Sequence, residues 1–414
     1  MLKKLIQLLA HVLIRATRFR TVQVLLHQLA AAYKLMQAQN TPTAGFVIPE
    51  ITPIRPRAGA ANAKPRLNLL VPALSQKHVF GGIETALQAF DLIRQHFASV
   101  RIIVTDESVT EPKNGAYYSA WPIATLVQDS PDENHIVVAG DRWNQTLPIH
   151  ANDYFMATAW WTAHAALDIL EWQEQQYPMV RARRLLYFIQ DFEPGFYPWS
   201  SRYVLAQATY TSTQKIIAVI NSGWLQDFLH DQGHCFSSEY VHQPRLHPAL
   251  AMARSRRPLF PKKRQLLVYG RPGTDRNAFP TIVAALRLWV QRYPEAQHWK
   301  IISAGESFPV IDLGHGCQLQ SVGKVSIDAY AELLSETAVG LSLMISPHPS
   351  YPPLEMAAFG VQTITNQFAN KDLARVCSYL ASVKYPAPDK LATILVDLCA
   401  NFDSLTPAAR SIDP

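Results

Sequence analysis

Residues 339–360 read VGLSLMISPHPSYPPLEMAAFG and combine a strand, a loop and the start of a helix. The apolar run 339–344 predicts a buried strand. Ser350 is a suitable N-cap for the helix that follows. Pro352 and Pro353 fit its first turn, where backbone N–H groups have no intrahelical partner. This strand–loop–helix order is typical of parallel sheets covered by helices.

The same alternation of short apolar runs and amphipathic helical runs extends over most of the chain. Strands are expected at residues 67–71, 100–105, 135–139, 154–157, 185–189, 216–220, 265–269, 300–303, 318–322, 340–344 and 362–365. Residues 242–264 are rich in proline and basic residues and are the predicted hinge. We therefore expect an α/β protein with two doubly wound, Rossmann-like domains facing across a cleft, at residues 66–245 and 246–414.

The first 65 residues differ from the rest of the chain. Residues 1–40 predict an amphipathic helical extension, and in residues 1–20 basic side chains oppose an apolar face. Such a face suits an anionic membrane surface or packing against the protein itself, and both interpretations stay open. Residues 41–65 hold five prolines and predict an extended linker.

Composition excludes several classes of protein. The 414 residues are 48% hydrophobic and 17% charged, which is typical of folded domains, and the charge of +6 permits binding of phosphates. The four cysteines contain no C-x-x-C pair, so a zinc site or a disulfide framework is not expected, and a reducing cytosol fits. The basic residues form no dense stripe interleaved with aromatic residues, which argues against nucleic acid as a partner.

Two motifs in the second half suggest a phosphate-containing ligand. In residues 269–277, YGRPGTDRN, Arg271 and Arg276 flank a turn at Gly273 after a predicted strand. Guanidinium groups at a helix start form a natural diphosphate clamp, although an arginine pair is also common on solvated faces. Glu355 lies one turn inside the helix that follows Ser350 and is placed to bind a diol, or simply to complement the helix dipole.

Two motifs in the first half are placed to face that ligand. Gly81 and Gly82 open a helix and allow close approach of an anion, or they mark a structural turn. Asp191 and Glu193 follow a predicted strand, where carboxylates hold a substrate hydroxyl or accept its proton. The alternative is that one of them caps the next helix. They lack a third ligand, so no metal site is expected.

Aromatic side chains gather near the predicted strand ends of the first half. Trp160, Trp161, Phe196, Tyr197 and Trp199 are candidates to stack on the sugar rings of an acceptor. Ordinary packing in the core or at its rim is the alternative for each of them.

Four stretches together resemble the GT-B fold nucleotide-sugar glycosyltransferases of glycosyltransferase family 4, which act with retention. These stretches are FGGIETAL (80–87), FIQDFEPGFYPWSSRYVLAQATY (188–210), YGRPGTDRNAF (269–279) and SPHPSYPPLEMAAFG with TNQFANKDL (346–360 and 365–373). Within that family the chain looks like the bacterial rhamnosyltransferases that build surface polysaccharides from dTDP-L-rhamnose. The resemblance runs from about Arg66 to about Lys371.

The resemblance implies specific roles for residues of both halves. In the second half the donor would contact Arg271, Gly273, Arg276, Lys324, Val325, Ser350, Tyr351 and Glu355, with Lys324 and Val325 near the nucleobase and Ser350 and Tyr351 near the diphosphate. In the first half Gly81 and Gly82 would face the donor phosphates. Gln190 and Asp191 occupy the strand end where many members carry a histidine, and Asp191, then Glu193, are the expected catalytic carboxylates beside Arg271 and Glu355. Trp160, Tyr197 and Trp199 join Gln190 and Asp191 as expected acceptor contacts.

The sequence departs from the family pattern at two positions, with Gln190 in place of the histidine and with a change in the E-x7-E motif. The E-x7-E motif keeps its second glutamate as Glu355, but Pro347 replaces the first. A 6-deoxy sugar of different stereochemistry would account for this loss.

The expected activity is transfer of a deoxyhexose, L-rhamnose, from a dTDP-sugar to a hydroxyl of a growing surface polysaccharide, with retention and without metal or other cofactor. The alternatives are a UDP-hexose-dependent enzyme of the same fold and a non-catalytic glycan-binding scaffold subunit. The expected location is the cytoplasm, peripheral to the inner face of the cell membrane, and the chain is also a candidate to form a homodimer.

Overall fold

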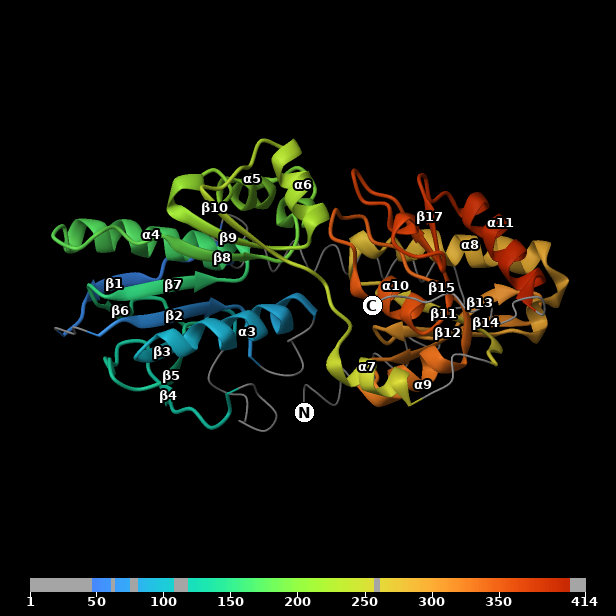
Figure 1. Cartoon of the computed structure of the whole chain (residues 1–414), viewed down its shortest axis with the longest axis horizontal. Helices are drawn as coiled ribbons and strands as arrows, with labels where there is room; N and C mark the ends of the chain where they lie inside the picture. Colours follow the sequence, from blue (N-terminus) through green and yellow to red (C-terminus); the bar gives the residue numbers. More distant parts are fainter. Residues whose placement is uncertain (1–46, 61–63, 75–80, 108–117, 257–260, 403–414) are drawn as a thin grey trace, which may run out of the picture. The chain divides into compact units, whose positions relative to one another are not determined.

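The computed structural model describes residues 47–60, 64–74, 81–107, 118–256 and 261–402 (Figure 1). The chain divides into two units, Met1–Thr52 and Pro53–Pro414. The expected amphipathic helix over residues 1–20 lies outside the described residues. All strands and α-helices named below belong to the second unit.

The first sheet has eight parallel strands in the order β10-β9-β8-β7-β2-β3-β5-β4. Their bounds are β2 Arg66–Val71, β3 Ser99–Val104, β4 Ile123–Ala124, β5 His135–Val138, β7 Asp153–Ala157, β8 Leu185–Ile189, β9 Ile216–Asn221 and β10 Ser238–His242. β2 is the first of these strands and lies inside the sheet. The chain then adds β3, β4 and β5 on one side of β2, and afterwards β7, β8, β9 and β10 on the other side. The switch in direction therefore lies between β2 and β7, where doubly wound sheets bind their ligands.

The second sheet has seven strands in the order β13-β14-β12-β11-β15-β16-β17, and only the β13–β14 pair is antiparallel among its described pairings. Their bounds are β11 Lys263–Gly270, β12 Lys300–Gly305, β13 Ile311–Gly314, β14 Cys317–Gly323, β15 Thr337–Leu341, β16 Gln362–Asn366 and β17 Leu380–Val383. The switch point of this sheet lies between β11 and β15.

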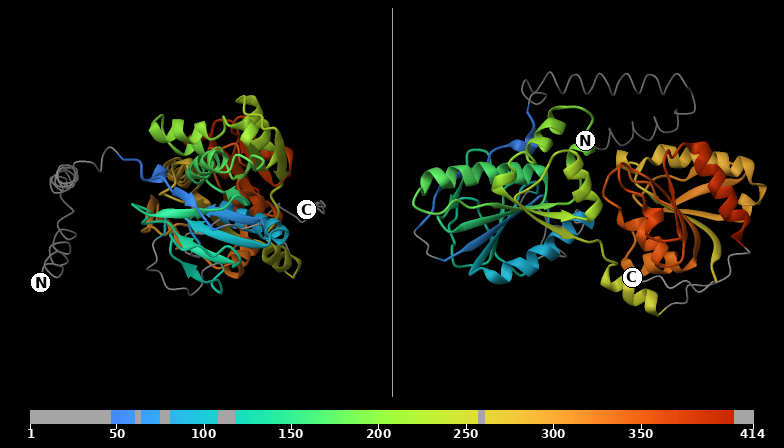
Figure 2. Two further views of the ribbon diagram at one scale, coloured as in Figure 1. Left: turned by 90° about the vertical axis from the view of Figure 1, so that its left-hand side faces the viewer. Right: turned by 45° about the horizontal axis from the view of Figure 1, so that its top comes forward.

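Helices cover both faces of each sheet (Figure 1). Their bounds are α3 Gly81–Ile93, α4 Trp160–Gln176, α5 Ser201–Ala208, α6 Gly223–Asp231, α7 Pro248–Ser255, α8 Phe279–Arg292, α9 Ile327–Glu336, α10 Tyr351–Ala358 and α11 Pro388–Ala400. In Figure 2, α8 and α11 lie side by side on one face of the second sheet.

Each sheet has a separate core on each face because side chains of a strand alternate in direction. On β2, Leu67 and Leu69 pack with Phe90 of α3, whereas Leu70 packs with residues of α4. On β11, Leu266 and Leu267 likewise belong to different clusters. Strands buried on both faces explain the continuous apolar runs in the sequence.

The structure confirms the predicted parallel α/β architecture, with local differences. The strand expected at 340–344 is β15, Thr337–Leu341, so residues 342–344 already belong to the loop that follows. A short strand, β1 (Arg55–Ala58), forms inside the predicted linker and pairs in parallel with β6 (Thr146–Ile149). The predicted hinge contains α7.

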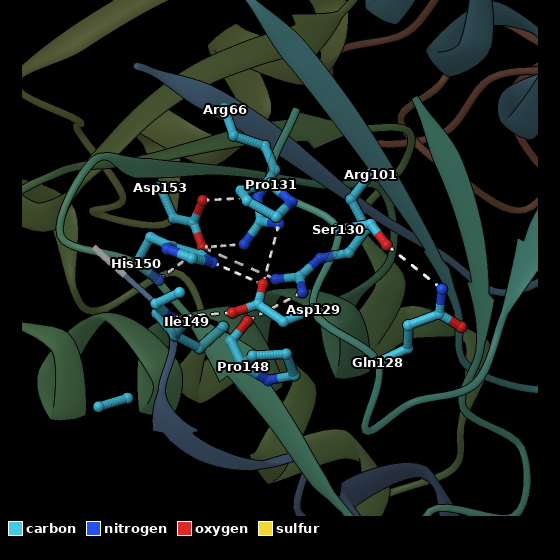
Figure 3. A network of polar contacts seen from close by, with 12 residues as sticks. Arg66, Arg101, Gln128, Asp129, Ser130, Pro131, Pro148, Ile149, His150 and Asp153 are labelled. Carbon is cyan, nitrogen blue, oxygen red and sulfur yellow. Dashed lines mark hydrogen bonds and ion pairs between the residues drawn. The ribbon is translucent and has the colours of Figure 1, made fainter. Parts of the chain in front are cut away.

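A buried ion network fixes the amino-terminal ends of β2, β3 and β7 (Figure 3). Asp153 accepts hydrogen bonds from Nε and Nη2 of Arg66 at 2.8 and 2.7 Å, and Nη2 of Arg101 lies 3.7 Å away. Asp129 bonds to the His150 ring at 2.7 Å. This network lies at the edge of the sheet opposite to the carboxyl ends of the strands.

Candidate active site

The switch point of the second sheet brings two sequence-predicted loops together. The loop after β11 holds Arg271, Gly273 and Arg276, and the loop after β15 runs into α10. The Ile345 N–H donates to the carbonyl of Arg276 at 2.7 Å, and the buried Asn277 amide donates to the carbonyl of Leu343 at 3.1 Å. The two loops therefore form one connected edge.

Buried polar side chains from β16 and the segment after it hold the second loop. Asn366 exchanges hydrogen bonds with the backbone of Met344, accepting at 2.7 Å and donating at 3.0 Å. The Lys371 ammonium, 1% exposed, donates to the carbonyls of Met344 at 2.8 Å and His348 at 3.3 Å. Burial lowers the pKa of Lys371 to about 7, and the nearby Asp191 carboxylate opposes this shift.

Ser350 is the N-cap of α10 and has an unusual backbone. Its φ of 68° and ψ of 136° lie in a region that favours glycine. Its N–H donates to Nδ1 of His348 at 3.0 Å, while its hydroxyl oxygen is buried without a hydrogen-bond partner among the described residues. A strained residue with an unused hydroxyl at a helix N-terminus is suited to bind an anion.

His348 joins this loop to the first sheet. Because Nδ1 accepts the Ser350 N–H, the neutral ring carries its proton on Nε2, 3.0 Å from the Asn221 side-chain amide. Burial lowers the pKa of His348 to about 4, with Asp191 opposing the shift and Lys371 adding to it, so the neutral ring is the form present at pH 7. The Asn221 side-chain nitrogen is the atom that faces the ring, and the Asn221 oxygen accepts from the Tyr351 hydroxyl at 3.5 Å.

Asp191 makes a second connection between the two sheets. The Ser346 hydroxyl donates to Oδ1 of Asp191, and the backbone N–H of Phe192 donates to the same oxygen at 2.8 Å. Asp191 is 8% exposed and stands next to the position where Pro347 replaces a glutamate. The structure thus places a carboxylate of the first half beside the loop that has lost one.

Glu193, the second expected catalytic carboxylate, is buried in a structural position. It accepts hydrogen bonds from the Trp160 backbone N–H, at the start of α4, and from the Tyr187 hydroxyl. Burial raises its pKa to about 8, and these two bonds oppose the shift. Glu193 therefore holds the start of α4, an earlier helix. The expected alternative, capping of the next helix, is wrong for Glu193, because Ser200 caps α5.

The expected acceptor contacts differ in exposure. Trp160 is 0% exposed and donates from Nε1 to the Tyr197 hydroxyl at 3.0 Å, so its ring offers no face to a sugar. The Gln190 amide donates to the Thr158 carbonyl between adjacent strands. Trp199, in contrast, is 93% exposed and stacks on Tyr203 at 5.8 Å with an interplanar angle of 8°.

The expected donor contacts of the second half lie on neighbouring loops. The Arg271 guanidinium pairs with Glu306 at 3.3 Å, and that of Arg276 lies 3.9 Å from the centroid of the Phe196 ring. Lys324 is exposed and Val325 half-buried directly after β14. Gly273 lies in the turn between the two arginines.

Two of the expected donor contacts, Glu355 and Tyr351, lie on α10 and interact with other elements. Burial raises the pKa of Glu355 to about 7, the Tyr330 hydroxyl opposes the shift, and the Glu84 carboxylate adds to it. The Tyr351 hydroxyl lies 3.2 Å from the Thr85 hydroxyl of α3, the helix that begins with Gly81 and Gly82. Tyr351 therefore spans the two sheets instead of pointing only at the helix end.

Sequence analysis missed several residues of this edge. Ser346 and His348 were quoted within the motif without a role, and Asn221, Asn366 and Lys371 were not singled out. Their roles depend on partners far away in sequence, which no local pattern reveals.

Among the described residues, no group of His, Cys, Asp or Glu side chains is arranged to hold a metal ion. Every helix in the described ranges is too short or too polar to cross a bilayer.

The two halves of the chain match two domains of one protein family. The N-terminal domain of WsaF matches residues 66–223, and the C-terminal domain of WsaF matches residues 264–396. The chain belongs to the WsaF family. Together the two matches cover more than half of the chain and contain the loops described above.

Three individual proteins are similar to this chain in sequence or in structure. The O-antigen biosynthesis protein RfbC of Myxococcus xanthus is 28% identical over 300 residues, which are 72% of this chain and 21% of that protein. Sucrose-phosphate synthase from Thermosynechococcus elongatus has a TM-score of 0.50 at 12% identity, covering 82% of this chain and 90% of its own. WaaG, a glycosyltransferase involved in lipopolysaccharide biosynthesis, has a TM-score of 0.48 at 14% identity, covering 81% and 90%.

These findings confirm the GT-B fold and the resemblance to glycosyltransferases that the sequence predicts. The chain spans about a fifth of the length of RfbC.

Proposed function

We propose that this chain is a retaining glycosyltransferase that moves L-rhamnose from dTDP-L-rhamnose to a hydroxyl of a growing surface polysaccharide. The observation that carries the proposal is the start of α10 at the switch point, where the buried Ser350 hydroxyl has no hydrogen-bond partner in the part of the chain that the structure describes. Membership of the WsaF family and similarity to a protein named for O-antigen biosynthesis support the assignment to polysaccharide assembly.

The second half binds the donor in this proposal. Arg271 and Arg276 supply guanidinium groups to the diphosphate, and the N-terminus of α10 supplies its positive dipole end and the Ser350 hydroxyl. Glu355 accepts a hydrogen bond from the nucleoside sugar. Lys324 and Val325, after β14, contact the nucleobase.

Departure of the nucleoside diphosphate is the difficult step of the reaction. The bond between the sugar C1 and the phosphate oxygen breaks, and a bond from C1 to the acceptor oxygen forms on the same face of the sugar. Arg271, Arg276 and the end of α10 stabilise the negative charge that develops on the leaving group, so no metal ion is required. Asp191 is the group assigned to hold the acceptor hydroxyl and take its proton.

The first half binds the glycan acceptor. The exposed Trp199 stacks on the half-buried Tyr203 and presents a flat aromatic face on the segment that follows Asp191. Aromatic faces combine apolar contact with a negative π surface that suits the C–H groups of a sugar ring. Tyr197, between Asp191 and Trp199 in the sequence, and Gln190, directly before Asp191, complete the proposed acceptor side.

A product assay tests the donor and the stereochemistry. The full chain is incubated with a rhamnan-type oligosaccharide acceptor and either dTDP-L-rhamnose or a UDP-hexose, with and without EDTA, and the product anomer is read by NMR. We expect a retained linkage from dTDP-L-rhamnose only, unaffected by EDTA. Arg271→Ala abolishes turnover, whereas Arg292→Ala, an exposed arginine at the end of α8, leaves it unchanged.

The other outcomes of this assay contradict parts of the proposal. Turnover of the UDP-hexose alone assigns a hexose donor, an inverted product excludes retention, and loss with EDTA excludes metal independence. Absence of turnover with every donor favours the non-catalytic scaffold.

We also propose that the protein works in the cytoplasm at the inner face of the membrane, with residues 1–20 as the attachment. The full chain is sedimented with vesicles containing anionic lipid, beside a variant that lacks residues 1–20. Binding that is unchanged by the deletion contradicts this part of the proposal.

A further inference from the structure

Glu306 follows β12, the strand that lies between β11 and β14 in the second sheet. Its carboxylate therefore stands between the loop of Arg271 and the loop of Lys324. Gly305 adopts a φ of 130°, and a Cβ there would meet the Gly270 carbonyl oxygen at 2.5 Å. This close approach lets the Glu306 N–H donate to the Gly270 carbonyl at 2.9 Å.

The Glu306 carboxylate accepts from three groups of the arginine loop. Gly273 donates its backbone N–H at 2.7 Å, Arg271 donates from Nε at 3.3 Å, and Thr274 donates its hydroxyl at 3.4 Å. A backbone N–H, a guanidinium and a hydroxyl are the donors that proteins commonly use to bind phosphate oxygens. Arg271 and Gly273 are also two of the proposed donor contacts.

We propose that Glu306 occupies the anion site of residues 271–274 when no nucleotide is bound, and that the donor diphosphate displaces it. This inference rests on the function proposed above. The carboxylate and the diphosphate then compete for the same N–H and guanidinium groups. Return of Glu306 to the loop also assists departure of the nucleoside diphosphate product.

The surroundings of Glu306 allow this exchange. The side chains of Arg271 and Glu306 are 30% and 35% exposed, and ion pairs of this exposure contribute little to stability. The Glu306 backbone is held by Gly270 and by the Ser321 hydroxyl, which donates to the Glu306 carbonyl at 2.9 Å. The side chain can therefore turn towards solvent while the loop stays in place.

The test is calorimetric titration of the full chain with dTDP and, separately, with inorganic pyrophosphate. Glu306→Gln removes the charge with little change of shape, and Glu306→Ala removes the carboxylate entirely. We expect each to bind dTDP about fivefold more tightly than wild type, equivalent to about 1 kcal/mol. Glu295→Gln, which removes an exposed charge before β12 at the opposite edge of the sheet, leaves the affinity unchanged.

A second readout separates competition for the loop from a general effect of charge. In an Arg271→Ala background the gain from Glu306→Ala falls below twofold, because the contested guanidinium is gone. The dissociation rate of dTDP, measured by stopped flow, is at least threefold lower in Glu306→Ala than in wild type. Circular dichroism checks that each variant is folded.

Failure of this inference is distinguishable from failure of the proposed function. If wild type binds dTDP or pyrophosphate but the Glu306 variants bind equally or more weakly, Glu306 positions the loop and the displacement proposal is overturned. If wild type binds neither anion, the loop is no diphosphate site, and both proposals are overturned.

Discussion

Replacing Asp153 by asparagine tests the buried ion network at the amino-terminal ends of β2, β3 and β7 (Figure 3). Asp153, Arg66 and Arg101 are each 0% exposed. The Asp153 carboxylate receives two hydrogen bonds from Arg66 at 2.8 and 2.7 Å and one from the His150 N–H at 2.9 Å. Removal of its charge leaves two buried guanidinium groups with Asp129 as the nearest remaining carboxylate.

We expect Asp153→Asn to lower the free energy of unfolding by about 3–5 kcal/mol, the usual cost of removing one charged partner of a buried ion pair. Exchange of the Arg66–Asp153 pair for apolar residues, as in the double variant Arg66→Met with Asp153→Leu, should recover part of this loss, because Arg101 is then the one guanidinium of the three buried charges that stays without Asp153. The network lies at the amino-terminal ends of strands in the first sheet, whereas the proposed nucleotide loops follow the carboxyl ends of strands in the second sheet. Affinity for dTDP should therefore not change.

Urea unfolding followed by circular dichroism measures the loss, and hydrogen exchange read by mass spectrometry shows which strands lose protection. Asp389→Asn is the matched control, because its ion pair with Arg292 is exposed and should contribute at most about 1 kcal/mol. A loss below about 1 kcal/mol for Asp153→Asn, or a double variant less stable than the single one, would refute this reasoning.

Three other predictions concern ligand binding. Ser350→Ala should weaken dTDP binding about three- to tenfold in titration calorimetry, because one hydroxyl contact is lost. Ser350→Gly should weaken binding similarly but raise the melting temperature, because glycine tolerates a φ of 68°. Equal affinity in both variants and wild type would contradict a role of Ser350 in binding phosphate. The pKa of Glu355, about 7, predicts that dTDP affinity rises between pH 6 and 8 as the carboxylate becomes ionised. Glu355→Gln should lose this rise and keep only the pH dependence that comes from the phosphates of dTDP, which both proteins share. Identical pH profiles of affinity for wild type and Glu355→Gln would count against this prediction. Trp199→Ala should raise the KM for the glycan acceptor at least fivefold, which corresponds to about 1 kcal/mol of aromatic contact, without changing donor affinity. Trp143 is another exposed tryptophan, so Trp143→Ala serves as the control and should change neither quantity.

Most of the fold could be predicted from the sequence because buried parallel strands appear as continuous apolar runs. The run at residues 185–189 matches β8, Leu185–Ile189, and that at 216–220 matches β9, Ile216–Asn221, within one residue. β10 and β13 were not predicted. Residues 238–242 are half-exposed or exposed at the edge of their sheet, and residues 311–314 contain only one buried side chain, so neither carries a strong apolar signal.

The end of β15 was misplaced for a physical reason that lies elsewhere in the chain. Met344 is apolar, but its N–H and carbonyl bond to Asn366, and its carbonyl also accepts from Lys371. Asn366 is the last residue of β16 and Lys371 follows that strand, and their bonds take the place of strand pairing at Met344. A local hydrophobic pattern contains no information about such partners.

The sequence predicted local geometry where a motif fixes its own backbone, as at the Arg271 turn and at the start of α10, although the Ser350 side chain makes no capping hydrogen bond there to the described residues. Prediction failed where burial depends on tertiary contacts. Glu193 and Trp160 were expected near the acceptor, yet the Glu193 carboxylate bonds to the Trp160 N–H in the interior. The sequence did not single out Glu306, because the role proposed for it depends on the sheet order that puts β12 between β11 and β14.

The central claim is that the carboxyl edge of the second sheet binds a nucleoside diphosphate. Calorimetric titration of the full chain with dTDP in the presence of EDTA, beside the Arg271→Ala variant, tests it most directly. We predict binding by the wild-type chain that EDTA does not alter and that Arg271→Ala weakens at least tenfold, equivalent to about 1.4 kcal/mol or more. Absence of binding to the wild-type chain, or binding of equal strength in the variant, would contradict the claim.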